Sequence, residues 1–174
     1  LGVLSVGADL AITTTGAISQ SGAITVFGNT TLAAGTAGNI TLDNAGNELG
    51  ALIVLTSANN VMLTDVTGMT LRGETAGNLN VTAGGAIKFG TLTTGGNLVV
   101  IAAGSITQET AADVLFVGGN TTLTAAYASN TYDLTLANVS EAGVSLNEFI
   151  GNVTIVNAAN VVLRDRDELT IGVT

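Results

Sequence analysis

The sequence predicts an all-β protein, a right-handed parallel β-helix (β-solenoid) in which successive coils of the chain stack along one axis. Three observations predict it: a motif that returns about every 20 residues, short apolar triplets that alternate with polar residues, and a composition of strand and turn formers. The 174 residues include 47% hydrophobic residues and 23 Gly, but no Pro, Cys, His or Trp. We expect roughly eight or nine coils of about 18–23 residues, which would make a rod about 40 Å long.

The recurring motif is a Gly-Asn pair followed by an apolar-x-apolar triplet. Its clearest copies are Gly38-Asn39-Ile40-Thr41-Leu42, Gly77-Asn78-Leu79-Asn80-Val81, Gly96-Asn97-Leu98-Val99-Val100 and Gly151-Asn152-Val153-Thr154-Ile155. The triplet alternates at the period of a strand, so its first and third side chains face one side and the middle one faces the other. Because no segment between the copies has the length of a crossover helix, each period is predicted to be one coil.

One Asn recurs in each period, and this predicts a ladder of stacked side chains. The members are Asn39, Asn60, Asn78, Asn97 and Asn120, separated by 21, 18, 19 and 23 residues. At the corner between two strands a residue often takes φ > 0, which Gly tolerates best and Asn next. We expect the Asn amides to bond to one another along the axis and to fix the register of the coils.

A longer duplication lies over the short repeat. The segment "GAISQ" from Gly16 returns as "GSITQ" from Gly104, an offset of 88 residues, and "SANNVMLTD" from Ser57 returns as "NAANVVLRD" from Asn157, an offset of 100. The growing offset indicates that the second copy carries loop insertions.

Apolar side chains at outward positions indicate a surface that packs against something. Met62, Val99 and Val162 each occupy the middle of a triplet, which a strand covered on one side would expose. We predict that they form a packing or self-association surface, covered by the chain's own long loops or by another rod.

Charge and composition exclude several classes of function. The formal charge of −9 repels nucleic acid, and the longest apolar run, Leu98 to Ala103, is too short for a membrane-spanning helix. Without His or Cys, the common nucleophile pairs and most transition-metal ligand sets are missing. The sequence also lacks the calcium-binding nonapeptide of β-rolls. We therefore expect no catalytic residues, no cofactor and no metal site.

The densest charged segment is Arg164-Asp165-Arg166-Asp167-Glu168. If it were a strand, Asp165 and Asp167 would share one face. Paired carboxylates of this kind serve carbohydrate-active β-helix enzymes, but a solvated charged turn is the interpretation we favour.

The repeats "GNLNVTAGGAI", "GNTTLAAGTAGNITLDNAGNELG" and "NVMLTD" resemble the shafts of filamentous-haemagglutinin-like bacterial exoproteins, which are large surface adhesins and β-strand-repeat proteins. The resemblance covers essentially the whole chain. It implies a right-handed parallel β-helix that is exported across the outer membrane. The secretion domain of that family carries Asn-Pro-Asn motifs, and this chain has no Pro, so the resemblance is to the shaft.

These observations together predict a structural repeat segment of an extracellular bacterial adhesin or fibre, a stiff rod with no enzyme activity. Residues 1–174 are expected to form a single repeat domain, a piece of a longer or processed chain since it begins with Leu1. The expected partners are other rods, end to end or side by side, and host or matrix glycans. The alternatives are a carbohydrate-active β-helix enzyme and, with less support, an ice-binding module that uses rows of Thr.

Overall fold

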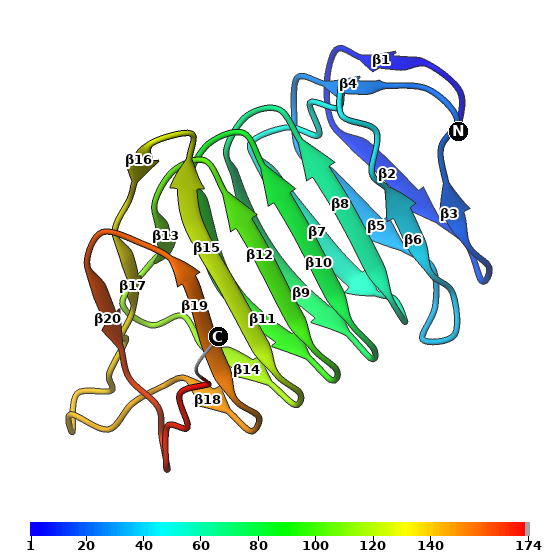
Figure 1. Cartoon of the computed structure of the whole chain (residues 1–174). Helices are drawn as coiled ribbons and strands as arrows, with labels where there is room; N and C mark the ends of the chain where they lie inside the picture. The colour runs from blue at the N-terminus through cyan, green and yellow to red at the C-terminus, as the bar shows by residue number, and fades with distance from the viewer. Residues whose placement is uncertain (173–174) are drawn as a thin grey trace.

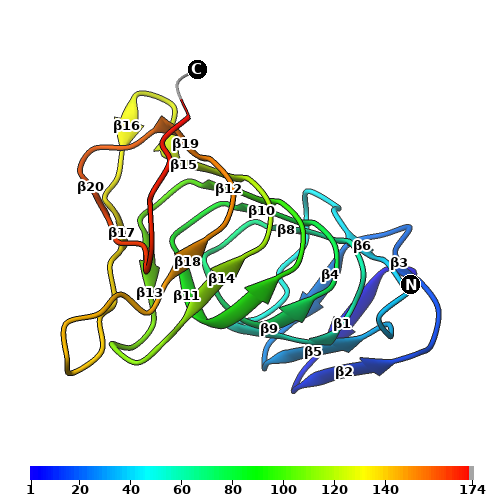
Figure 2. The ribbon, with the colours of Figure 1, turned by 90° about the horizontal axis from the view of Figure 1, so that it is seen from below.

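The chain winds into a parallel β-solenoid of about six turns. The computed structural model describes residues 1–172, which contain strands and turns and no helix. In Figure 1 the strands of successive coils lie side by side along the rod, and β1 and β20 lie at opposite ends of it. The view from below, in Figure 2, shows the coils one behind another. The predicted fold class is thus confirmed.

One side of the rod is an eight-stranded sheet in which every pairing is parallel except that of the short β16. Its strands, in spatial order, are β3 (Ile18–Ser19), β6 (Ile40–Leu42), β8 (Val61–Asp65), β10 (Leu79–Ala83), β12 (Leu98–Ala102) and β15 (Thr121–Tyr127), with β16 (Asn130–Thr131) and β19 (Val153–Asn157) both paired to β15.

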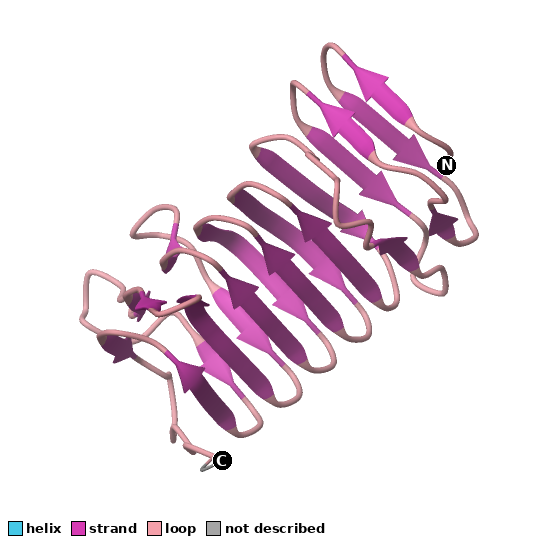
Figure 3. Cartoon of the chain, turned by 45° about the horizontal axis from the view of Figure 1, so that its top comes forward, coloured by secondary structure: helices cyan, strands magenta, loops and turns pink. Residues whose placement is uncertain are grey.

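The remaining sides are formed mainly by a ten-stranded sheet, which faces the first sheet across the core (Figure 3). Its strands are β2 (Leu10–Thr13), β5 (Thr30–Ala33), β7 (Leu52–Ser57), β9 (Met69–Thr75), β11 (Ile87–Thr94), β13 (Ile106–Gln108), β14 (Leu115–Val117), β17 (Leu134–Leu136), β18 (Glu148–Phe149) and β20 (Val161–Leu163). A further pair, β1 (Leu4–Val6) and β4 (Ile24–Val26), lies near the N-terminal end.

The strands form because apolar and polar residues alternate along them. In β10, Leu79, Val81 and Ala83 are buried, while Asn80 and Thr82 between them face outward. The same positions stack from coil to coil, since Leu79 pairs with Val61 on one side and with Leu98 on the other. The buried rows make one continuous hydrophobic core along the rod, and burial of this apolar surface supplies most of the stability.

Two long strands bend, which lets one strand serve two sides of the rod. In β9 the bend lies at Gly73, whose φ of 116° is open to glycine and strained for other residues. In β11 the pairing with β9 shifts register between Phe89 and Leu92. A coil in this part of the rod therefore needs only two strands and two turns.

The rod has fewer coils than the eight or nine predicted from the short period. The period of 18 and 19 residues holds only in the middle, from Asn60 to Asn97. The coil from Asn120 to Asn152 is 32 residues long, against 23 for the coil before it, because it contains the β15–β16 hairpin and a loop before β18. Insertions of this kind consume chain without adding coils.

The two copies of the long duplication lie on different sides of the rod. The first copy places β3, β6 and β8 in the eight-stranded sheet, whereas β13, β17 and β20 of the second copy pair with one another in the ten-stranded sheet. An offset of 88 residues covers the four coils from β3 to β12 and then part of a fifth. The second copy therefore begins at β13, which lies in the ten-stranded sheet.

Candidate functional site

A ladder of Asn side chains runs along one corner of the rod. The side-chain Oδ1 of each Asn accepts a hydrogen bond from the backbone N–H of the Asn one coil further on. The bonds are Asn60 N to Asn39 Oδ1 at 3.1 Å, Asn78 N to Asn60 Oδ1 at 2.9 Å, Asn97 N to Asn78 Oδ1 at 2.8 Å, Asn120 N to Asn97 Oδ1 at 2.8 Å and Asn152 N to Asn120 Oδ1 at 3.0 Å. All five candidate ladder residues therefore lie in register, together with Asn152.

The bonding differs from the amide-to-amide chain that we expected. A bond between two ladder amides occurs at one step, from Asn60 Nδ2 to Asn39 Oδ1 at 3.2 Å. Between the other neighbouring ladder residues, the Asn Oδ1 accepts only from the backbone N–H of the next coil. Each corner is therefore hydrogen-bonded directly to the main chain of the next corner. Asn160, the sequence counterpart of Asn60, is not in the ladder: it lies before β20 and donates to Asp133 Oδ1 at 2.8 Å.

The ladder also explains why Gly precedes Asn. A Cβ on Gly77 or on Gly96 would lie 2.5 Å from the Oδ1 of the ladder Asn in the preceding coil, and a Cβ on Gly151 would lie 2.6 Å from Asn120 Oδ1. Our expectation of φ > 0 at these corners was wrong. The residues with positive φ are Gly35, Gly50, Gly73, Gly143 and Ala128, and the Gly of the motif is required for space.

Two buried amide pairs were missed by the sequence reasoning. Gln20 and Asn47 exchange two hydrogen bonds of 2.8 Å, and the buried Asn47 Oδ1 also accepts from Ile24 N at 2.9 Å. Gln108 and Asn147 repeat this with bonds of 2.8 and 3.0 Å, and Leu115 N donates to Asn147 Oδ1 at 3.2 Å. The duplication marks one member of each pair, since Gln20 and Gln108 are the last residues of the "GAISQ" and "GSITQ" segments, but it does not identify the partner Asn.

Two Asp side chains accept hydrogen bonds from backbone N–H groups just after the Asn of each amide pair, at Leu49 and at Phe149. Asp65 is 1% exposed, and its carboxylate accepts from Leu49 N at 2.6 Å and from Thr67 N at 2.7 Å. Asp165 accepts from Phe149 N at 3.0 Å in the second copy. The segment from Arg164 to Glu168 begins after β20 ends, so it is a turn in which Asp165 and Asp167 do not share a strand face.

The outward-facing side chains of β8, β10, β12 and β15 form a surface that we call the uncharged face. It consists of Met62, Thr64, Asn80, Thr82, Val99, Ile101, Thr122 and Thr124. Met62 and Val99 lie in one row, each paired with Asn80 between them. Val162 is outside this surface, because β20 belongs to the ten-stranded sheet, where Val162 pairs with Thr135.

Ile101 is a member of the uncharged face that the sequence reasoning missed. It lies in the second outward row, paired with Thr82 and Thr124, and 45% of its surface is exposed. It occupies the last outward position of β12, two residues after Val99, so the alternation already predicted its direction.

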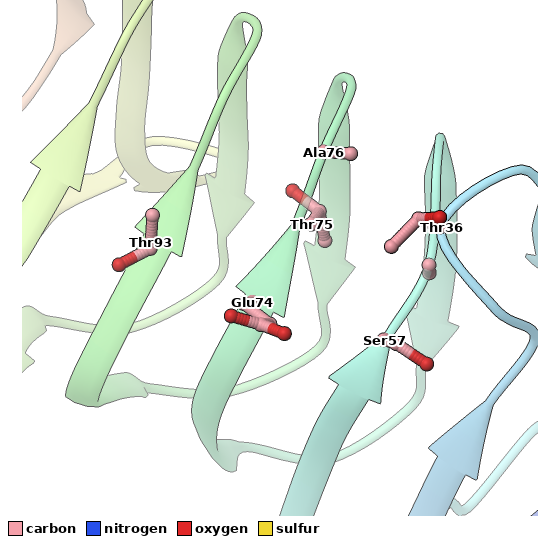
Figure 4. A pocket seen from close by; sticks show the side chains of 7 residues that line it. Thr36, Ser57, Glu74, Thr75, Ala76 and Thr93 are labelled. Atoms are coloured by element: carbon pink, nitrogen blue, oxygen red, sulfur yellow. The ribbon is translucent and has the colours of Figure 1, made fainter.

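Hollows in the surface are shallow. A groove of about 440 Å³ follows the edge of the uncharged face and is lined by Val66, Thr82, Ile101 and Tyr127, among others. The hollow in Figure 4 has about 160 Å³, and Ser57, Glu74 and Thr93 enter it from the successive strands β7, β9 and β11. The second volume is below the roughly 300 Å³ at which pockets for small molecules begin.

The comparisons with known proteins identify a family of repeats. Residues 1–56, 58–88 and 76–156 match a family model described as "Repeats of unknown function (DUF5649)". The chain belongs to this family. No curated protein matches the chain, and no solved structure does. Two of the matched DUF5649 segments overlap over residues 76–88, which contain one ladder corner and all of β10.

One ion pair of this DUF5649 chain crosses two coils. Arg72 on β9 reaches over Gly90 to the carboxylate of Glu109, and a Cβ on Gly90 would lie 3.2 Å from Arg72 Nε. Gly90 is thus small because a side chain passes over it. Both partners are partly exposed, so the pair contributes about 0–1 kcal/mol.

Asp113 has an altered pKa. Burial alone would raise the pKa of this carboxyl, but hydrogen bonds from the Thr110 side chain and backbone and from Thr91 outweigh burial and lower the pKa below its ordinary value. Thr110 N lies 2.7 Å from Asp113 Oδ2. The carboxylate therefore fixes the loop before β14.

Within residues 1–172, no group of three His, Cys, Asp or Glu side chains is placed to hold a metal ion. In the same range no helix is long and apolar enough to cross a membrane.

Proposed function

We propose that this DUF5649 chain is a structural repeat segment of an extracellular bacterial fibre or adhesin, of the filamentous-haemagglutinin-like kind that its repeats resemble. In this role the segment is a stiff rod that carries binding regions away from the cell. The observation that carries the proposal is the continuity of the rod. Parallel pairing joins every coil to the next through the eight-stranded and ten-stranded sheets, over a single core.

The direction of the hydrogen bonds supports this mechanical role. Backbone bonds between coils run along the axis of a β-solenoid, and the Asn ladder adds one side-chain bond per coil in the same direction. Bending the rod requires these bonds to stretch on one side while the core is compressed on the other. A stack of this kind resists bending, whereas tension on its ends opens it one coil at a time.

The surface supports a partner that makes many weak contacts. The uncharged face offers Thr and Asn side chains at regular spacing, which suits neutral glycans and like rods. We place the segment on the bacterial surface, secreted across the outer membrane. The proposed role involves no catalysis, which fits carboxylates that are used as turn caps at Asp65, Asp113 and Asp165.

Two experiments test the proposal. Antibodies against the chain should label intact cells of the bacterium that produces it, and protease added outside should remove the label. Single chains stretched between marker domains should lengthen in steps of about 60–80 Å, the extended length of a coil of 18–23 residues. Label that appears only after the cells are permeabilised would refute the surface role, and unfolding in one large step would refute the coil-by-coil rod.

A further inference from the structure

Charged side chains avoid one side of the rod. Between residues 60 and 127, Arg72, Glu74 and Lys88 lie on β9 and β11 of the ten-stranded sheet, and Glu109 and Asp113 lie in the loop after β13. The remaining charged residue in this range, Asp65, is buried and bonded to backbone N–H groups. The uncharged face therefore has no ionisable side chain, in a chain with a net charge of −9.

The same face is regular and partly apolar. Five consecutive residues of β10 pair with β8 and five with β12 without a shift in register, so no bulge interrupts this part of the sheet. Met62 is 41% exposed and Ile101 is 45% exposed, and Val66 at the edge is 42% exposed. These side chains stand among Thr and Asn, which can bond across a contact without a charged partner.

We propose that the uncharged face is a dimerisation surface, and that its partner is the same face of a second copy of this chain. Two chains of charge −9 repel each other, and the repulsion is weakest when the sides without charge meet. A two-fold axis in the contact makes the surface self-complementary. Both copies carry rows about 4.8 Å apart, so outward side chains interdigitate as two sheets pack about 10 Å apart. The inference rests on the proposed fibre role, since it supplies the contact by which rods align.

The contact area sets the strength of the pairing. The four strands of the uncharged face, β8, β10, β12 and β15, with about 17 Å of outward-facing strand each, present about 330 Å² per copy. Stable interfaces bury about 800 Å² per partner, so this segment pairs weakly and its dimer depends on concentration. Added salt screens the repulsion between the charged sides and strengthens the dimer.

Cysteine crosslinking is a direct test because the sequence has no Cys. Ile101→Cys should form disulfide-linked dimers under mild oxidation. Thr135→Cys, at an exposed outward position of β17 on the other sheet, is the matched control and should form few. In sedimentation equilibrium, Ile101→Lys should weaken dimerisation about tenfold or more, whereas Thr135→Lys should leave it unchanged. A mixture of Ile101→Lys and Ile101→Glu chains should pair better than either alone.

The outcomes separate this inference from the proposed function. Equal crosslinking of the two cysteine variants, or a wild-type chain that stays monomeric at millimolar concentration and high salt, would overturn the dimer. So would a glycan that binds this face while the chain remains monomeric. Circular dichroism of each variant checks that the β-solenoid is intact. Cell-surface labelling is independent of these results, so the fibre role and the dimer face can fail separately.

Discussion

The side-chain Oδ1 of Asn78 lies 2.8 Å from the backbone nitrogen of Asn97, one coil further along the rod. A side chain that bonds to the main chain of the next coil fixes register more strictly than a bond between two mobile amides, because the main-chain N–H has a single direction. The ladder is thus a set of connections between corners, and its members are interchangeable only with side chains that place an acceptor at the same point.

Removing one ladder acceptor should weaken the rod by a measurable amount. We expect Asn78→Ala to lower the free energy of unfolding by about 1 kcal/mol, the usual net value of one hydrogen bond. Asn80→Ala, at an outward position of the same strand, is the control and should cost less. Urea denaturation followed by circular dichroism measures both. Equal losses in the two variants would show that the ladder contributes nothing specific.

Gly96 is the residue that the ladder constrains most directly. A Cβ here would lie 2.5 Å from Asn78 Oδ1 and 2.8 Å from the carbonyl carbon of Gly77. We expect Gly96→Ala to cost about 1–3 kcal/mol, the range for overpacking. The same change at Gly16, where a Cβ meets nothing within 4 Å, should be nearly neutral.

A double variant separates the two contacts of Gly96. Asn78→Ala in the Gly96→Ala background removes the clash with Oδ1 but keeps the clash with the Gly77 backbone. The second change should therefore cost less than it does in the wild-type chain. Strictly additive losses, measured by the same urea titration, would contradict the explanation that Gly is present to make room for the Asn side chain.

The sequence predicted the fold class because the determining signal is local and repeated. An apolar-x-apolar triplet after each Gly-Asn pair sets which side chains point inward, and the repeat spacing sets which strands stack. The number of coils, and the sheet in which each strand lies, depend on the loop insertions. The repeat itself does not predict the conformation of these insertions. Val162 was grouped with Met62 because both are the apolar middle residue of a triplet, although the insertions place Val162 on another side of the rod.

The candidate site was predictable only where it follows the period. The positions of Asn39 to Asn120 follow it, and so do the outward directions of Met62 and Val99. The pairing of Gln20 with Asn47 could not be predicted, since the two residues are 27 apart and face each other only through the loop after β6. Each has a sequence counterpart, at Gln108 and Asn147, but their partnership depends on the fold.

The Gln20–Asn47 pair should behave as one unit. Asn47 is buried and uses its amide to bond Gln20, Ile24 N and the carbonyl oxygen of Leu42, the last at 3.1 Å. We expect Asn47→Ala to cost about 2–4 kcal/mol, because several buried groups lose their partners together. Gln20→Ala should cost less, since Gln20 is only half-buried.

A double-variant cycle tests the coupling of this pair. The combined change should cost less than the two single changes added together, by about 0.5–3 kcal/mol, as for residues in one hydrogen-bond network. The equivalent cycle for Gln108 and Asn147 should give a coupling of similar size. A coupling near zero in both copies would mean that the two amides are satisfied independently.

Acid should destabilise the loop that holds Asp113. The hydrogen bonds from Thr110 and Thr91 lower the pKa of this carboxyl in the folded chain. A lowered folded pKa means that the carboxylate stabilises the fold at pH values above its unfolded pKa, about 3.9. That contribution is lost as the pH falls through the lower folded pKa. Asp113→Asn should therefore reduce stability at pH 7 and change it little near pH 2. The urea midpoint measured at both pH values checks this, and a loss in the variant that is as large at pH 2 as at pH 7 would exclude ionisation of Asp113 as its cause.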